Sequence, residues 1–246
     1  MTTERRKVVI ALSGGVDSSV AAALLLESGG DVQGVFMITC EQGRHAQAEA
    51  EEVARRLAIR LTVLDLRDDF AQILNYFFDE YAKARTPNPC VMCNRLVKFG
   101  KLWDFARDAG AEFLATGHYA KVLDRGGQAG LYEGADPAKD QSYALSMIHR
   151  DVLTHILLPM GERSKTQARQ IAQRLALGTE AKAESQEICF IPDDNYVALL
   201  EQRHPELVRP GAIVDSAGKA LGTHQGIHRY TIGQRRGLPV RCVGCR

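Results

Sequence analysis

The chain has 246 residues, of which 45% are hydrophobic and 25% charged, and its formal net charge is only +1. This length is sufficient for one large domain and a smaller one. No stretch reaches the roughly 18–20 apolar residues of a membrane span, and the first residues lack the apolar centre of a secretory signal. These features exclude a membrane-spanning class and predict a soluble, cytoplasmic protein with no membrane partner.

The first predicted elements surround a glycine-rich loop. Residues 7–12, KVVIAL, have the composition of a buried parallel strand, and residues 19–27 that of a helix. Between them lies SGGVDSS, in which Ser18 is the expected helix cap, while Gly29 and Gly30 are expected to end the helix. The predicted order is therefore strand, glycine turn, helix.

A loop of this kind is suited to phosphate. Glycine lets the backbone approach a ligand closely, and the N-terminus of a helix attracts anions. SGGVDSS lacks the GK[ST] ending of the Walker loop and instead resembles the PP-loop of ATP pyrophosphatases, which release pyrophosphate and leave an adenylyl group on their substrate. The alternative is a serine–glycine turn that binds nothing.

Strands and helices continue to alternate after the loop. Strands are predicted at 31–38, 61–66 and 112–120, and helices at 46–57, 70–83 and 95–109, with the prolines of TPNPC interrupting the helical pattern. This alternation predicts an α/β fold with a doubly wound parallel sheet, whose ligands bind at the carboxyl ends of the strands. The polar or loop residues at those ends are SGGVDSS, Met37, Asp65, Gly117 and His118.

The pattern changes in the second half of the chain. A Gly- and Asp-rich insertion occupies 124–140, helical stretches follow at 141–150 and 164–176, and short apolar pieces separated by glycines begin after Pro205. We therefore predict a catalytic domain at 1–203 and a small β-rich module at 204–246. From Arg203 onward eight Lys or Arg residues face two acidic ones, which is compatible either with a nucleic-acid partner or with a solvated surface.

Cysteines mark a second candidate site. In a chain without an export signal, six cysteines are more typical of reactive or metal-binding thiols than of disulfides. Cys90 and Cys93 form a CxxC pair between a proline turn and a predicted helix N-terminus, whose dipole is expected to lower the thiol pKa. Cys40 is assigned to packing.

Five motifs occur in one order: SGGVDSS, TPNPCxxCN, ATGHYA, KDQSYAL and ESQEICFI. Together with YTIGQRRGL at 230–238 they resemble the tRNA-specific 2-thiouridylase family, over about residues 7–237. The resemblance implies an enzyme that uses ATP and Mg²⁺ to adenylate O2 of the wobble uridine, position 34 of tRNA, and then replaces that oxygen by sulfur from a cysteine persulfide. It also implies two partners, tRNA and a protein that donates sulfur.

The resemblance also assigns roles to individual residues. ATP would be held by Ala11, Leu12, Ser13, Gly14, Gly15, Val16, Asp17, Ser18, Met37 and Gly117. Cys93 would be the nucleophile and Cys189 the persulfide-bearing cysteine. The target base and tRNA would be contacted by Asn88, Pro89, Cys90, His118, Lys139, Asp140 and Gln141. Without this context Cys189 would be a small buried apolar residue, His118 a polar residue at a strand end, and Lys139 to Gln141 a solvated helix cap.

Two departures from the family leave alternatives open. Many members carry aspartate at the position of Cys90, so Cys90, Cys93 and Cys189 could instead be three ligands of a [4Fe–4S] cluster; we favour the persulfide relay. Members also continue past GQRRGLPV into a longer β-barrel region, whereas this sequence ends in RCVGCR. Cys242 and Cys245 are either surface thiols or zinc ligands with Cys90 and Cys93. The rival functions are a PP-loop enzyme that adenylates a small molecule and a catalytically silent tRNA- or nucleotide-binding protein.

Overall fold

The computed structural model of the chain describes residues 5–40, 44–182, 188–191 and 195–240. The chain divides into two compact units. Unit 1 consists of Met1–Ala71 and Cys90–Ser185, and unit 2 consists of Gln72–Pro89 and Gln186–Arg246. The boundary expected after residue 203 stays a prediction.

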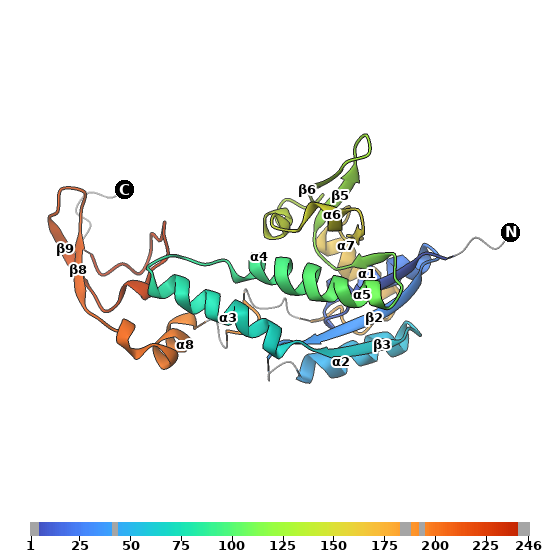
Figure 1. Cartoon of the computed structure of the whole chain (residues 1–246), viewed down its shortest axis with the longest axis horizontal. Coiled ribbons are helices and arrows are strands. Elements are labelled where there is room, and N and C mark those ends of the chain that lie inside the picture. The colour runs from blue at the N-terminus through green and yellow to red at the C-terminus, as the bar shows by residue number, and fades with distance from the viewer. Residues whose placement is uncertain (1–4, 41–43, 183–187, 192–194, 241–246) are drawn as a thin grey trace. The chain divides into compact units, whose positions relative to one another are not determined.

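A parallel five-stranded sheet forms the centre of unit 1 (Figure 1). Its strands, in the order in which they pair, are β3 (Leu61–Asp65), β2 (Asp31–Ile38), β1 (Lys7–Ala11), β4 (Phe113–Ala115) and β7 (Ile156–Leu157). The order reverses at β1, because β2 and β3 lie on one side of it and β4 and β7 on the other. This is the doubly wound α/β topology that the sequence predicted, with its switch point beside β1.

Helices cover both faces of this sheet. On one face, Val8 and Ile10 of β1 pack in a core with helices α1 (Val16–Glu27), α2 (Arg44–Arg56) and α7 (Lys165–Arg174). On the other, Val9 packs with apolar residues of the helices listed next. These are the π-helix η2 (Asn94–Lys101), α5 (Leu102–Asp108), the 3-10 helix η3 (Ser142–Leu145) and α6 (Arg150–Leu153). Alternate residues of the buried strand β1 therefore pack into two hydrophobic cores, one on each face of the sheet.

The start of α1 differs from the prediction. The helix begins at Val16 with Gly15 as its N-cap, so the prediction that Ser18 caps it was wrong. Ser18 lies in the first turn, where its hydroxyl donates to the carbonyl of Gly15 at 3.2 Å. The Ser18 side chain therefore bonds to the loop and does not cap the helix. The predicted helix end is confirmed at Gly29, whose φ is +85°.

Three further predictions need correction. The insertion at 124–140 contains half of an antiparallel hairpin, formed by β5 (Ala120–Asp124) and β6 (Ala129–Glu133). The stretch 141–150 is not one helix but contains the short 3-10 helix η3, then turn residues and the first residue of α6, and the short strand β7 was not predicted. The helix expected at 95–109 begins earlier, with α4 (Pro89–Cys93), because proline is well tolerated in a first helical turn.

Unit 2 combines helices with a hairpin. It holds most of α3 (Arg67–Ala82), then α8 (Tyr196–Arg203), and the antiparallel strands β8 (Gly211–Val214) and β9 (Ala220–His224). The predicted β-rich character of the C-terminal segment is confirmed by this hairpin. The unit is held by aromatic pairs, among them Phe77 edge-on to Phe190 at 5.3 Å and Tyr81 stacked on Tyr196 at 5.0 Å between ring centroids.

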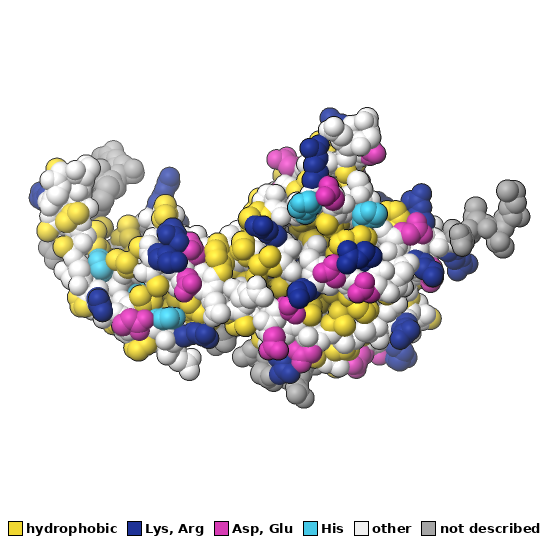
Figure 2. Space-filling model, in the orientation of Figure 1, with side chains coloured by type: hydrophobic (Ala, Val, Ile, Leu, Met, Phe, Trp, Pro, Cys, Tyr) yellow, Lys and Arg dark blue, Asp and Glu magenta, His cyan; other side chains and the backbone are white. Residues whose placement is uncertain are grey.

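Charges of both signs are interspersed on one face of the molecule. Lys and Arg side chains alternate with Asp and Glu on the face that Figure 2 shows. No helix in the described part of the chain has the length and apolar character needed to cross a membrane.

Candidate nucleotide and cysteine sites

The glycine loop lies at the carboxyl end of β1, next to the switch point of the sheet. Gly14 has φ +74°, and a Cβ there would come within 2.8 Å of Glu49 Cβ, so only glycine fits this turn. Gly117, after β4, approaches the same loop. A Cβ on Gly117 would lie 2.7 Å from the backbone nitrogen of Ser18. The two strand ends are therefore in backbone contact, as the sequence predicted for the carboxyl edge.

Serine hydroxyls hold the loop in shape. Ser18 Oγ accepts from the backbone N–H of Ser13 at 3.1 Å and lies 3.0 Å from Ser13 Oγ. Ser19 Oγ donates to the carbonyl of Gly15 at 2.7 Å. The first N–H groups of a helix have no partner within it, so the first turn of α1 offers donors and the positive end of the helix dipole. The loop fits a polyphosphate.

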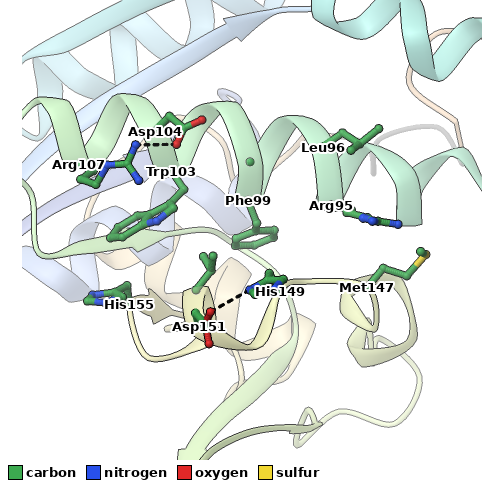
Figure 3. Close-up of a pocket in the computed structure, with 12 residues that line it drawn as sticks. Arg95, Leu96, Phe99, Trp103, Asp104, Arg107, Met147, His149, Asp151 and His155 are labelled. Atoms are coloured by element: carbon green, nitrogen blue, oxygen red, sulfur yellow. Dashed lines mark hydrogen bonds and ion pairs between the residues drawn. The ribbon is translucent and has the colours of Figure 1, made fainter.

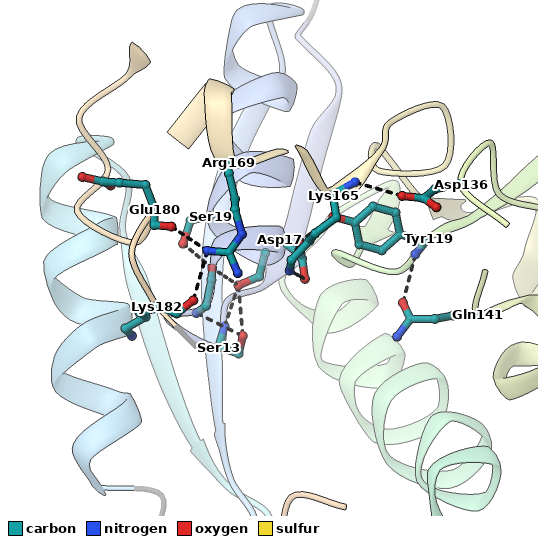
Figure 4. Close-up of polar contacts among 12 residues, drawn as sticks. Ser13, Asp17, Ser19, Tyr119, Asp136, Gln141, Lys165, Arg169, Glu180 and Lys182 are labelled. Atoms are coloured by element: carbon teal, nitrogen blue, oxygen red, sulfur yellow. Dashed lines mark hydrogen bonds and ion pairs between the residues drawn. The ribbon is translucent and has the colours of Figure 1, made fainter. Parts of the chain in front are cut away.

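Asp17, in that first turn, is part of a partly buried polar contact (Figure 4). Lys165 Nζ donates to both of its carboxylate oxygens at 2.8 Å, and Tyr119 Oη donates to Oδ1 at 2.7 Å. A carboxylate beside a phosphate loop is suited to hold Mg²⁺, which prefers oxygen ligands and bridges phosphates. Asp17 fits this use, since one of its oxygens can exchange Lys165 for the metal.

Two more cations border the loop. Lys182 Nζ donates to the carbonyl of Gly14 at 2.8 Å and is ion-paired with Glu49. Arg169 Nη1 donates to the carbonyls of Glu180 and Lys182, at 2.6 and 3.1 Å. Sequence analysis missed Lys165, Arg169 and Lys182, because they come from α7 and the segment after it, about 150 residues along the chain from the loop. Their local sequence contains no motif that could have indicated this role.

The remaining residues predicted for ATP occupy the same edge of the sheet. Ala11 ends β1, and the N–H of Leu12 donates to the carbonyl of Val35 on β2 at 2.8 Å. Val16 begins α1 and is buried. Met37 is half-buried near the carboxyl end of β2. The structure therefore brings this predicted set together, while the role of each residue stays a prediction.

Cys90 and Cys93 lie in α4, one helical turn apart, and neither forms a disulfide. The expectation that the helix dipole lowers their pKa was wrong. Burial raises the pKa of both thiols, and the nearby ammonium of Lys98 offsets this only in part. Both thiols are therefore predominantly protonated at neutral pH.

His118 connects the end of β4 with the helix that follows the cysteines. Its Nδ1 lies 2.7 Å from Thr116 Oγ1, and its Nε2 lies 3.5 Å from Lys98 Nζ on η2. Burial, and then the charge of Lys98, lower the pKa of His118 well below its usual value. The imidazole is therefore neutral at physiological pH, and Lys98 is a cation beside both the histidine and the cysteines that the sequence did not indicate.

The other predicted sulfur and base residues are distributed between the units. Asn88, which is exposed, and Pro89, which is buried, belong to unit 2, as does the exposed Cys189. Across the described residues no three Cys, His, Asp or Glu side chains are grouped as metal ligands would be. Cys242 and Cys245 lie outside the described residues, so the zinc alternative stays a prediction. Cys40 is partly buried.

Lys139 ends a turn, in which its N–H donates to the carbonyl of Asp136, and Asp140 and Gln141 lead from this turn into η3. Although burial alone would raise it, the pKa of Asp140 is lowered by hydrogen bonds from Ser142 and from backbone N–H groups. Gln141 Oε1 accepts from the N–H of Tyr119 at 3.0 Å. Asp140 thus stabilises the segment before η3, Gln141 joins that segment to the backbone of Tyr119, and the predicted contact with tRNA stays a prediction.

A groove of about 640 Å³ lies elsewhere on unit 1 (Figure 3). Trp103 stacks on His155 at 4.9 Å between ring centroids, and two polar pairs line the groove, Arg107 with Asp104 and His149 with Asp151. None of the residues predicted for the site lines this groove.

Comparison with known proteins identifies the family. Residues 6–193 match the model of the tRNA methyl transferase HUP domain, and residues 198–243 match that of the tRNA methyl transferase PRC-barrel domain. The chain is 46% identical over 250 residues to the tRNA-specific 2-thiouridylase MnmA of Carboxydothermus hydrogenoformans, covering 95% of this chain and 68% of that protein. The chain belongs to the tRNA-specific 2-thiouridylase family. It is also 45% identical to the MnmA of Clostridium perfringens (strain ATCC 13124), over 95% of this chain and 69% of that protein.

A solved structure supports the fold independently of close sequence similarity. The NMN synthetase of Francisella tularensis matches with a TM-score of 0.50 at 17% identity, covering 82% of this chain and 75% of that one. This likeness shows the shared α/β fold and nothing about the substrate.

Proposed function

We propose that the chain is an ATP-dependent tRNA uridine 2-sulfurtransferase, which replaces O2 of the wobble uridine, position 34, by sulfur. The observation that carries this proposal is identity of 43–46% with 2-thiouridylases over nearly the whole chain, in a molecule whose phosphate loop is intact. Members of this family use ATP, and the Gly14 turn with its surrounding cations provides a cradle for it. We also place the reaction in the cytoplasm, where tRNA and ATP are available.

In the first step, O2 of uridine attacks the α-phosphorus of ATP and pyrophosphate leaves, so that the carbonyl oxygen becomes part of an AMP leaving group. Gly14 and the first turn of α1 bind the phosphates, and Lys182 contributes positive charge beside them. Mg²⁺, held by Asp17, would neutralise part of the phosphate charge. Without such cations the incoming oxygen would meet three to four negative charges.

In the second step, the terminal sulfur of a persulfide on Cys189 attacks C2 and AMP leaves. Cys93, which must first lose its thiol proton, then attacks the sulfur of Cys189 that is bound to the delivered atom. The 2-thiouridine is released and a Cys93–Cys189 disulfide remains, which a thiol reductant must reduce. The sulfane sulfur is supplied by a donor protein. Asn88, Pro89, Cys90 and His118 are proposed to face the base.

The relay is preferred to a [4Fe–4S] cluster because Cys93 and Cys189 suffice for delivery and resolution. The three thiols Cys90, Cys93 and Cys189 are a chemically adequate ligand set for a cluster, which keeps this alternative in the tests below. In the relay, Cys90 is a neighbour of the target base and not a ligand of an iron–sulfur cluster.

The test is reconstitution with purified chain, unmodified tRNA, Mg-ATP and a persulfide donor. Mass spectrometry of nucleosides should show 2-thiouridine, formed with one pyrophosphate per sulfur inserted. Pyrophosphate release that depends on a small molecule instead of tRNA would favour the other PP-loop class. Binding of tRNA without any pyrophosphate release would indicate a catalytically silent protein.

A further inference from the structure

Lys165 has a fixed backbone and a side chain that reaches the phosphate loop. It is the first residue of α7, whose N-cap Ser164 forms a capping box with Gln167. The backbone N–H of Lys165 also donates to Asp136 Oδ2 at 3.1 Å. The side chain is only 16% exposed and extends to Asp17. These two contacts fix the backbone from which the Lys165 side chain extends.

The contact with Asp17 neutralises the loop in the absence of ligand. An unpaired carboxylate in the first turn of α1 would repel the phosphates that the loop is shaped to bind. Lys165 cancels this charge through both carboxylate oxygens. If Asp17 supplied an oxygen ligand to Mg²⁺, the Lys165 ammonium would be left with a weaker partner and would be available to phosphate oxygens.

Open space adjoins Lys165. A cavity of about 430 Å³ is lined by the first two turns of α7, including Lys165, Thr166 and Arg169, and by Glu180 and Ala181. Lys165 therefore lies beside open space that a ligand could occupy.

We propose that Lys165 binds the polyphosphate of ATP directly, and that its ion pair with Asp17 is the arrangement it adopts before the nucleotide binds. This inference rests on the proposed ATP chemistry and adds a residue to it. Lys165 thus acts twice: it keeps the empty loop neutral, and it then balances phosphate charge while Asp17 binds the metal.

Equilibrium binding of ATP, with and without Mg²⁺, tests the contact. Lys165→Met should weaken ATP binding at least tenfold, and Lys165→Arg should restore it to within about threefold, because a charge-assisted hydrogen bond to phosphate is lost and regained. Binding of adenosine should be the same in both variants, which reports an intact fold. The matched control is Arg174→Met at the other end of α7, an exposed residue paired with Glu27. ATP binding to Lys165→Met at the parental affinity would overturn the proposal.

A double variant separates direct binding from an effect through Asp17. In an Asp17→Asn background, Lys165→Met should again weaken ATP binding about tenfold if the ammonium touches phosphate. If the second substitution has no further effect, Lys165 acts only by pairing with Asp17, and the proposed contact is refuted. Thiolation of tRNA by the parent chain is measured separately, so failure of the proposed function would not be mistaken for failure of this contact.

Discussion

The phosphate loop and the cysteine helix α4 are built in different ways. The loop is held by residues adjacent in sequence, since Ser13, Gly15 and Ser18 bond to one another within one turn. The environment of Cys93 comes from elsewhere, because burial raises its pKa, Lys98 opposes this, and the second proposed cysteine belongs to unit 2. An anion site can be encoded in a few consecutive residues, whereas thiol chemistry here depends on assembly of the chain.

The largest expected effect is on thiolation at the cysteine site, and it should leave ATP binding at the phosphate loop almost unchanged. Cys93→Ser or Cys189→Ser should reduce thiolation below detection, since each removes a sulfur atom that the relay requires. ATP binding should stay within about twofold of the parent, because the phosphate loop is a separate structure. Mass spectrometry of tRNA nucleosides and equilibrium ATP binding measure the two effects. Loss of ATP binding in either variant would show that the regions are not independent.

The second-largest expected effect concerns the phosphate loop. Asp17→Ala should lower tRNA-dependent pyrophosphate release by about 10²–10³-fold, because the proposed metal ligand is lost and Lys165 is left unpaired. Circular dichroism should show an intact fold, since Asp17 is not part of either core. Unchanged pyrophosphate release would contradict the assignment of the loop.

A third substitution tests the contact between two strand ends. Gly117→Ala would place a Cβ 2.7 to 3.0 Å from backbone atoms of Asp17 and Ser18. The backbone must shift, which we expect to cost about 1–3 kcal/mol of stability and to weaken ATP binding several-fold. Gly110→Ala is a control for a glycine away from the loop, with positive φ and no atom within 4 Å of the added Cβ. Thermal unfolding with and without ATP measures both effects.

A smaller effect distinguishes the two sulfur mechanisms. In the persulfide relay Cys90→Asp should retain activity within about threefold, because Cys93 and Cys189 still deliver and resolve sulfur. If a [4Fe–4S] cluster operates, the same substitution should remove a ligand and abolish thiolation. Anaerobic purification with iron and sulfide analysis gives the second measurement, and about four irons per chain would overturn the relay.

The smallest expected effect concerns the basic C-terminal segment. If Arg235 and Arg236 contact tRNA phosphates, replacing both with Ala should weaken tRNA binding several-fold. The slope of log affinity against log salt should become less steep by about 0.7–0.9 for each contact removed. ATP binding is the control and should not change. An unaltered slope would favour the alternative, in which this segment is a solvated surface that does not contact tRNA.

The sequence by itself determined the central strands, the helix-ending glycine and the phosphate loop. The strand at 31–38 was predicted with the bounds that β2 has, because buried β-branched runs and glycine turns are local signals. The parallel, doubly wound character of the sheet followed from alternation of strands and helices, since parallel strands require crossover connections, whereas the order of its strands came from the structure.

Only the tertiary structure decided how these pieces act on one another. The raised pKa of Cys93 comes from burial by distant residues, so the local helix-terminus rule failed there. The partner of Asp17 lies 148 positions away, and no local pattern identifies Lys165. Short elements such as β7 also form because a neighbouring strand offers hydrogen bonds, not because of their own composition. Backbone turns are encoded by residues that are close in sequence. The electrostatic environment of a side chain depends instead on which residues folding brings within a few ångströms of it.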